Sequence, residues 1–311
     1  MVSAIDGTLV LAQALLVLLA APLLSGLIKA AKAALQNRRG PGLLQPAFDI
    51  LKYLGRESVV SEHASWIFHV VPYVYFGAYL TAALLVPTIV ARPPLEALGD
   101  AIVLVGLFAL ARFALALAAL DTASNFGGMG TARELAFAAL VEPSLMLGLF
   151  ALALPVGSTA LGAMTAGSRL SASTLLAGGA LFIVAIAETG RIPVDNPDTH
   201  PELTMAHEGM LLEYSGRPLG LLFWGAQIKQ VVVLSLLAAL FLPWGLGRDA
   251  APMAMLTALV LYLAKLALLG LALALVETSL PKLRVFRIPD LLGAAGLLSL
   301  LAVVALYVVG G

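Results

Sequence analysis

The chain has 311 residues, of which 61% are hydrophobic and 12% charged, and its formal net charge is zero. Repeated apolar runs predict a helical membrane protein, because roughly 20 helical residues cross a bilayer, and the lack of alternating strands excludes a β-barrel. No cysteine is present, which excludes disulfides and cysteine-bound iron–sulfur clusters in this chain.

We predict an all-α fold, a polytopic membrane protein with eight spans that form a single transmembrane domain over residues 1–311. The spans lie near residues 9–28, 66–90, 101–120, 134–156, 172–189, 221–243, 252–276 and 290–309. Twelve of the 18 basic residues lie in the connections on one side of these spans, and three lie on the other side. The positive-inside rule therefore places both termini outward and the long loops at about 29–65 and 190–220 in the cytoplasm.

The first long loop contains a basic pair followed by an amphipathic segment. After Arg38, Arg39 and a Gly-Pro turn, apolar residues recur at spacings typical of one helix face, namely Leu43, Leu44, Phe48, Ile50, Leu51 and Leu54. We expect an amphipathic helix that lies in the membrane interface. The basic pair has two interpretations, a docking site for a partner or a topology signal.

Charged residues also occur inside the predicted spans, at Arg112, Glu142, Lys229 and Lys265. Each costs about 2.5–3.5 kcal/mol at mid-span, so we expect none of them to face lipid. Glu134 precedes Glu142 by eight residues, and this spacing lets both carboxylates address one side of a helix. For Arg112, a structural ion pair and a relay role both stay open. A proton relay is favoured for Lys265, and snorkelling toward the cytoplasm is the alternative for Lys229.

The most acidic segment lies between the fifth and sixth predicted spans. It carries six carboxylates, at Glu188, Asp195, Asp198, Glu202, Glu208 and Glu213. The segment is also rich in apolar residues, which favours burial against a partner over a solvated face, and clustered acids raise one another's pKa values. His200 and His207 are candidates for the same relay. A metal site is disfavoured because the spacing of these histidines matches no common ligand pattern.

Other catalytic signals are absent from the sequence. It contains no phosphate-binding loop, no arrangement typical of a nucleophilic enzyme and no basic patch for nucleic acid. We interpret the GGMG sequence at 127–130 as a flexible turn and not as a dinucleotide-binding fingerprint.

Two motifs resemble the signatures of a known family. NRRGPGLLQPAFDILK (37–52) resembles the first signature of subunit 1 of respiratory NADH:quinone oxidoreductase, and ETGRIPVD followed by EYSG (188–216) resembles the second. The segment between RRGP and GLLQP is shorter than in the respiratory enzyme. LDTASNFGGMGTARE (120–134), DNPDTHPELTMAHE (195–208) and ETSLPKLRVFRIPD (277–290) are similar to formate hydrogenlyase subunit 4, the homologous subunit of energy-converting group 4 nickel–iron hydrogenases.

The resemblance implies a membrane-arm subunit of an energy-converting hydrogenase or formate hydrogenlyase type complex, in the inner (plasma) membrane of a bacterium or archaeon. Such a subunit seats a soluble redox arm and couples electron transfer to the movement of protons or sodium ions. It implies no catalytic centre, metal or cofactor in this chain, and places a nickel–iron centre and iron–sulfur clusters in partner subunits. The expected partners are hydrogenase-type large and small subunits, an iron–sulfur subunit, antiporter-like membrane subunits and the lipid bilayer.

Together with the charge pattern, the resemblance suggests two sets of functional residues. The candidates for proton relay and coupling are Glu134, Glu142, Glu188, Asp195, Asp198, Glu202, His207, Glu208, Glu213, Lys229 and Lys265. The candidates for docking of the soluble arm are Arg38, Arg39, Gln45, Asp49, Lys52, Arg133 and Arg191.

Two other functions stay open. The first is the quinone-chamber subunit of a respiratory complex, against which the shortened first signature argues. The second is an independent secondary transporter, which is disfavoured because the chain shows no internal repeat with interrupted spans.

Overall fold

The computed structural model describes residues 4–90, 95, 98–169, 171–195, 206–247, 252–281, 283 and 287–309. These residues form ten α-helices and a short 3-10 helix, with no β-strand among them, so the predicted all-α fold is confirmed. The elements are α1 (Ala4–Leu35), α2 (Gln45–Leu54), α3 (Trp66–Leu85), α4 (Ala101–Asp121), α5 (Asn125–Ala153), α6 (Leu161–Gly167), α7 (Ala172–Glu188), η2 (Glu208–Leu211), α9 (Gly216–Phe241), α10 (Pro252–Ser279) and α11 (Ile288–Val309).

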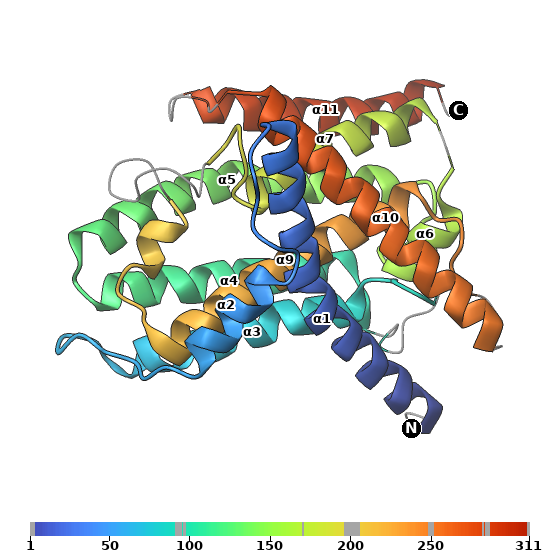
Figure 1. Cartoon of the computed structure of the whole chain (residues 1–311). Helices are drawn as coiled ribbons and strands as arrows, with labels where there is room; N and C mark the ends of the chain where they lie inside the picture. The colour runs from blue at the N-terminus through green and yellow to red at the C-terminus, as the bar shows by residue number, and fades with distance from the viewer. Residues whose placement is uncertain are drawn as a thin grey trace.

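Seven helices of the described chain are long and apolar enough to cross a membrane, namely α1, α3, α4, α5, α9, α10 and α11. The fifth predicted span corresponds to α7, an apolar helix of 17 residues. In Figure 1 the start of α1 and the end of α11 both lie toward the right-hand side of the bundle. Seven of the eight predicted spans are therefore confirmed as helices able to cross a membrane, and α7 as an eighth crossing stays a prediction.

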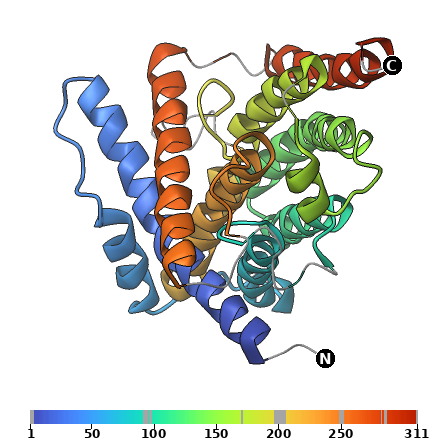
Figure 2. The ribbon, with the colours of Figure 1, turned by 90° about the vertical axis from the view of Figure 1, so that its right-hand side faces the viewer.

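The helix α9 lies at the centre of the bundle (Figures 1 and 2). In its most apolar window, 72% of the residues are buried, the highest share among the seven long helices. The helices α3 and α4 pack together beside it, α5, α7 and α11 form a second group, and α1 pairs with α10. Tyr75, Phe108 and Ile228 are among the largest fully buried side chains. Charged side chains on the inner faces of α4 and α9 are therefore enclosed by protein.

The expectation of a flexible turn at 127–130 is wrong, because these residues lie in the first turns of α5. A Cβ atom on Gly127 would lie 2.6 Å from the carbonyl oxygen of Ala119. One on Gly130 would lie 2.8 Å from the carbonyl oxygen of Ala206. These glycines let the start of α5 approach α4 and the segment before η2 more closely than any other residue allows.

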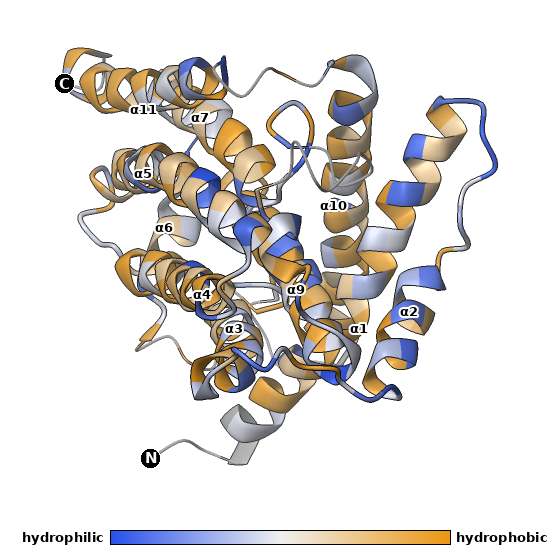
Figure 3. Cartoon of the chain, turned by 90° about the vertical axis from the view of Figure 1, so that its left-hand side faces the viewer, coloured by the Kyte–Doolittle hydropathy of each residue, from blue (hydrophilic) through white to orange (hydrophobic). Residues whose placement is uncertain are grey.

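The short helix α2 has the predicted amphipathic character. Its Pro46 and Ile50 are buried against the bundle, whereas Phe48 is 58% and Leu51 63% exposed. Figure 3 shows the first part of the connection between α1 and α2 as hydrophilic, beside helices that are largely hydrophobic. Apolar residues on the outer face of a short amphipathic helix are typical of a helix at the membrane surface.

The EYSG motif fastens the start of α9 to the first turn of α3 and to the loop that precedes it. The ring of Tyr214 stacks on Phe68 with centroids 3.9 Å apart, and its hydroxyl donates to the Phe68 carbonyl oxygen at 3.0 Å. The Ser215 hydroxyl donates to the carbonyl oxygen of Val59 at 2.9 Å and accepts from its N–H at 2.7 Å. Gly216 has φ +55°, and a Cβ there would lie 2.3 Å from a carbonyl oxygen of that loop. The motif is therefore an architectural clamp beside the acidic segment.

Candidate functional site

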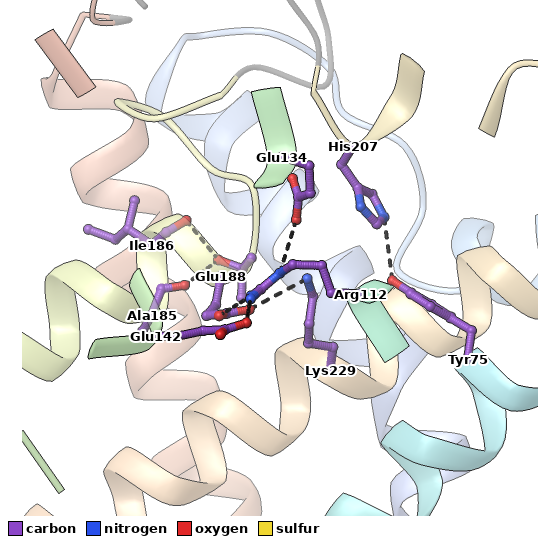
Figure 4. A network of polar contacts seen from close by, with 10 residues as sticks. Tyr75, Arg112, Glu134, Glu142, Ala185, Ile186, Glu188, His207 and Lys229 are labelled. Carbon is purple, nitrogen blue, oxygen red and sulfur yellow. Dashed lines mark hydrogen bonds and ion pairs between the residues drawn. The ribbon is translucent and has the colours of Figure 1, made fainter. Parts of the chain in front are cut away.

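A buried arginine on α4 gathers three carboxylates from two other helices (Figure 4). The guanidinium of Arg112 forms ion pairs with Glu134 and Glu142 of α5 and with Glu188 at the end of α7. Its Nε lies 3.5 Å from Oε1 of Glu134, and its two terminal nitrogens donate hydrogen bonds to Glu142 and Glu188. Glu134 and Glu142 thus address one side of α5, in agreement with their spacing. Removal of these charges from water is costly, and the mutual pairing offsets that cost.

Lys229 of α9 adds a second cation to this group. Its Nζ lies 3.8 Å from Oε2 of Glu188 and 5.7 Å from the ring centroid of Tyr79. The Lys229 residue is only 6% exposed, so the snorkelling alternative is wrong. We call this set of five residues the arginine cluster: Arg112, Lys229, Glu134, Glu142 and Glu188. With every member ionised, the cluster carries three negative and two positive charges, so one added proton neutralises it.

His207 links the region of the cluster to the segment before α9. Its Nε2 lies 3.4 Å from the hydroxyl oxygen of Tyr75 on α3 (Figure 4). Burial, assisted by the positive charge of Lys229, lowers the pKa of His207 to about 3, so its imidazole is uncharged at neutral pH. Asp195 accepts a hydrogen bond from the backbone N–H of Ala206 at 3.1 Å and so fixes the residue beside this histidine. A neutral imidazole has one donor and one acceptor nitrogen, which suits proton transfer along hydrogen bonds.

A second buried group of ion pairs surrounds Glu277 near the end of α10. Its carboxylate oxygens lie 2.8 Å from Nζ of Lys32 and 3.3 Å from Nη1 of Arg191. Arg191 also donates to Oε1 of Gln230 at 3.1 Å. Arg191 was a candidate for docking, but its guanidinium lies inside the bundle, where it cannot contact a soluble partner directly. A carboxylate as buried as Glu277, which is 3% exposed, needs such cationic partners.

A cavity of about 240 Å³, which we call the polar cavity, lies between these two groups. Its wall consists of Ser25, Lys29, Lys32, Glu134, Ala187, Glu188, Thr189, Gly190, Arg191, Asp195, His207, Glu208, Leu211, Phe223, Ala226, Gln227, Lys229 and Gln230. Three buried atoms of the wall have no hydrogen-bond partner among the described residues: Oε2 of Glu188, Oε1 of Gln227 and Nε2 of Gln230. The polar lining and the volume are sufficient for several water molecules that would satisfy these atoms.

The structure does not bring Lys265 to the arginine cluster. Its ammonium group donates to the carbonyl oxygens of Leu242, at 2.6 Å, and of Trp244, and lies 4.5 Å from the centroid of the Trp244 ring. At 1.5 Å per helical residue, the end of α9 that these groups occupy lies about 20 Å from Lys229. Leu242 is the C-cap of α9 and Trp244 follows in the next connection, and carbonyl groups at a helix C-terminus lack helical partners and attract cations, which accounts for the position of Lys265.

The remaining candidates for proton transfer are spread over the acidic segment. Glu208 begins η2 and contributes to the wall of the polar cavity, whereas Glu213 is exposed. Asp198, Glu202 and His200 lie outside the described residues, so their roles stay predictions.

The candidates for docking, apart from Arg191, lie at or near the surface. Arg38, Arg39 and Lys52 are exposed, and Arg133 is half-buried. The amide of Gln45 donates to the carboxylate of Asp49 at 2.9 Å, one turn further along α2. This hydrogen bond holds the outer face of α2 in one arrangement, but it engages no other element.

Sequence reasoning missed Glu277, Lys32 and Tyr75. A sequence signal existed for Glu277, since this single carboxylate closes the apolar run of α10 and is followed directly by residues of a basic loop. Lys32 is one of several basic residues after the first span, and nothing in the sequence separates it from its neighbours. Tyr75 resembles any aromatic residue of an apolar helix, and only the fold places it beside His207.

A family model described as NADH dehydrogenase matches residues 8–309 of the chain. The chain belongs to the NADH dehydrogenase (subunit 1) family. Its seven long apolar helices, its two signature motifs and the buried charges of α4, α5, α7 and α9 are thus features of a member of this family.

Within the family, the chain is most informatively compared with hydrogenase subunits. It is 40% identical to formate hydrogenlyase subunit 4 of Escherichia coli (strain K12) over 301 residues, covering 95% of this chain and 97% of the relative. It is 38% identical to hydrogenase-4 component C of the same strain, with 89% of each chain covered. Its fold resembles a chain of the membrane-bound sulfane sulfur reductase, an archaeal respiratory membrane complex, with a TM-score of 0.82, 21% identity and coverage of 95% and 98%. The similarity to the hydrogenase branch that the motifs indicated is confirmed.

Proposed function

We propose that the chain is a membrane-arm subunit of an energy-converting hydrogenase or formate hydrogenlyase type complex. In this role it docks the soluble redox arm on its cytoplasmic loops and couples electron transfer to translocation of protons or sodium ions. Similarity to two hydrogenase subunits over almost the whole chain supports the type of complex. The orientation, with both termini outward, follows from the distribution of basic residues.

The observation that carries the coupling role is the arginine cluster beside the polar cavity. Three carboxylates and two cations are held inside the span region, where ionisable residues are rare and are usually functional. The cluster has one excess negative charge, which one added proton would neutralise. Two of its carboxylates, Glu134 and Glu188, contribute to the cavity wall. Water in the cavity would connect Glu188 with His207 and Glu208 of the acidic segment. The segment would in turn face the soluble arm.

Redox chemistry belongs to partner subunits in this proposal. The chain has no cysteine to bind an iron–sulfur cluster or a nickel–iron centre. We assign the electron carriers to hydrogenase-type large and small subunits and to an iron–sulfur subunit, and the further ion pathway to antiporter-like membrane subunits. Arg38, Arg39 and Lys52 are exposed on the predicted cytoplasmic side, where they can pair with acidic groups of a soluble partner.

A Glu188→Gln variant of the whole complex in sealed vesicles tests the coupling role. The amide keeps the shape of the side chain but cannot hold or release a proton. We expect hydrogen oxidation with a soluble dye to survive and ion uptake per electron to fall. The exposed carboxylate Glu62 supplies the matched control as Glu62→Gln. Equal loss of both activities would show that the cluster serves assembly, and unchanged coupling would refute the proposal. Repeating the assay with and without sodium distinguishes the two ions.

A quinone-chamber function fits the polar cavity less well. Pockets for organic ligands are mostly apolar and measure about 300–1,000 Å³. The polar cavity, at about 240 Å³, is smaller, and four basic and four acidic side chains line it. Such a wall suits water and protons better than a lipid-soluble ring.

A further inference from the structure

Glu277, near the end of α10, joins the first helix of the chain to the beginning of the acidic segment. Its Oε2 lies 2.8 Å from Nζ of Lys32 on α1, and its Oε1 lies 3.3 Å from Nη1 of Arg191. The Glu277 side chain is fully buried, whereas those of Lys32 and Arg191 are 12% and 11% exposed. Stability alone does not explain such a group, because apolar side chains of similar volume often replace a buried ion pair without loss of stability. The segments that the group holds together explain it better.

Arg191 lies at the centre of the turn that links α7 to the acidic segment. Its carbonyl oxygen accepts hydrogen bonds from the backbone N–H groups of Val194, at 2.9 Å, and Asp195, at 3.1 Å. Its own backbone N–H donates to the carbonyl oxygen of Ile186 at 3.1 Å. The turn is thus folded around the residue whose side chain Glu277 holds.

Two short stretches of backbone connect this turn to the arginine cluster. Glu188, the last residue of α7, precedes Arg191 by three residues. On α9, Lys229 of the cluster is followed directly by Gln230, whose Oε1 accepts a hydrogen bond from Nη2 of Arg191 at 3.1 Å. A displacement of the Arg191 guanidinium would therefore reach one carboxylate and one cation of the cluster.

The same turn also positions the histidine of the site. Asp195 lies at the far end of the turn and accepts the hydrogen bond from the backbone N–H of Ala206, the residue before His207. His207, Glu188 and Arg191 all contribute to the wall of the polar cavity. The position of Arg191 thus affects both groups between which the cavity water would carry a proton.

We propose that Glu277 is a positioning residue for coupling, which holds Arg191 so that Glu188 and His207 face the polar cavity together. This role deepens the proposed function and rests on it. Lys32 provides the second anchor, because it ties the other oxygen of the same carboxylate to α1. Loss of the charge on Glu277 would leave the Arg191 guanidinium buried without its carboxylate, and the cost of an uncompensated buried charge favours an open turn that admits water.

Chemical labelling of the turn tests the positioning. The chain has no native cysteine, so Thr189→Cys, at a half-buried residue of the cavity wall, gives it a single reactive thiol. In the detergent-solubilised complex, a water-soluble maleimide should label this thiol about tenfold faster once Glu277→Gln is added, as expected for the loss of a charge-assisted interaction. Glu277→Asp keeps the charge and should keep labelling slow. The matched control is Asp290→Asn, which removes an exposed carboxylate at the start of α11 and should not change the rate.

Ion uptake by the complex in sealed vesicles tests whether this position matters for coupling. Glu277→Gln should lower ion uptake per electron while hydrogen oxidation with a soluble dye survives, and Glu277→Asp should restore most of the uptake. A double variant, Arg191→Met with Glu277→Met, leaves neither charge of that pair unpaired. It should assemble and oxidise hydrogen but show low ion uptake, so it decides the matter even where Glu277→Gln fails to assemble.

Three results would overturn the positioning role. An unchanged labelling rate in Glu277→Gln would mean that Arg191 keeps its place without the carboxylate. Faster labelling with unchanged ion uptake, or full uptake in the double variant, would mean that the ion pairs serve only stability. Failure of the proposed function is distinguishable, because Glu188→Gln would then leave coupling unchanged. The positioning role fails alone when Glu188→Gln lowers coupling and Glu277→Gln does not.

Discussion

The arginine cluster should behave as one energetic unit, and a double-mutant cycle on Arg112 and Glu188 measures this. Both side chains are almost fully buried and directly paired. Removal of one partner from a buried ion pair costs about 3–5 kcal/mol, because it leaves an uncompensated charge. We expect each single Gln variant to lose stability in that range. The double variant should lose less than the two single losses added together.

The geometry of the pair sets the size of the coupling energy, which is the difference between the summed single losses and the loss in the double variant. Neighbouring residues in one network show coupling energies of about 0.5–3 kcal/mol, and the near-complete burial of both groups places this pair near the upper end. The Arg112–Glu142 cycle should give a smaller value, since the Glu142 side chain is 35% exposed. Denaturant titration of the purified full-length protein in micelles, followed by circular dichroism, provides the four free energies of unfolding. Additive losses within about 0.5 kcal/mol would refute the idea of a single unit.

Three further predictions address other parts of the chain. Replacement of both Arg38 and Arg39 by Ala should reduce co-purification of the soluble subunits, and normal assembly with full activity would mark the pair as topology signals. Lys265→Met should destabilise the chain by about 1–3 kcal/mol, since it strips the α9 carbonyls of their donor, but should leave ion uptake per electron intact. In the folded state the pKa of His207 is lowered from 6.5 to about 3, so the folded state binds fewer protons than the unfolded state between these two pH values. Stability should be complete above pH 6.5 and fall as the pH drops toward 3, and His207→Asn should flatten that part of the unfolding curve.

The helix boundaries show which features of the fold hydropathy alone can predict. Apolar runs identified the seven long helices and the shorter helix α7, but α3 ends at Leu85 and not near residue 90. Pro87 follows shortly, and the residue before a proline avoids helical dihedral angles. At the start of α5 the opposite error occurred, because Gly127 and Gly130 usually signal a turn. These glycines instead allow close approach to two other backbone segments, and those contacts form only in the tertiary structure.

The candidate site was partly predictable for a similar reason. Charges within apolar runs are conspicuous, so Glu142 and Lys229 could be selected from the sequence. Their partners could not be assigned, since ion pairing depends on how separate helices are rotated and stacked. Lys265 shows the limit, because the same sequence signal marks a lysine that binds carbonyl groups at the end of α9. A buried charge in a span indicates that a partner exists without indicating which one.

The balance of charge around the polar cavity explains how an extra proton would be directed. The basic residues of its wall are Lys29, Lys32, Arg191 and Lys229, and the acidic residues are Glu134, Glu188, Asp195 and Glu208. With all eight ionised the wall is neutral, so the cavity as a whole has no preference for a cation. The arginine cluster alone has an excess negative charge, and an added proton is therefore most stable there. Glu142→Gln removes this excess without altering the wall, so it should abolish the preference while the cavity stays intact. Glu213→Gln, at the surface, should change neither.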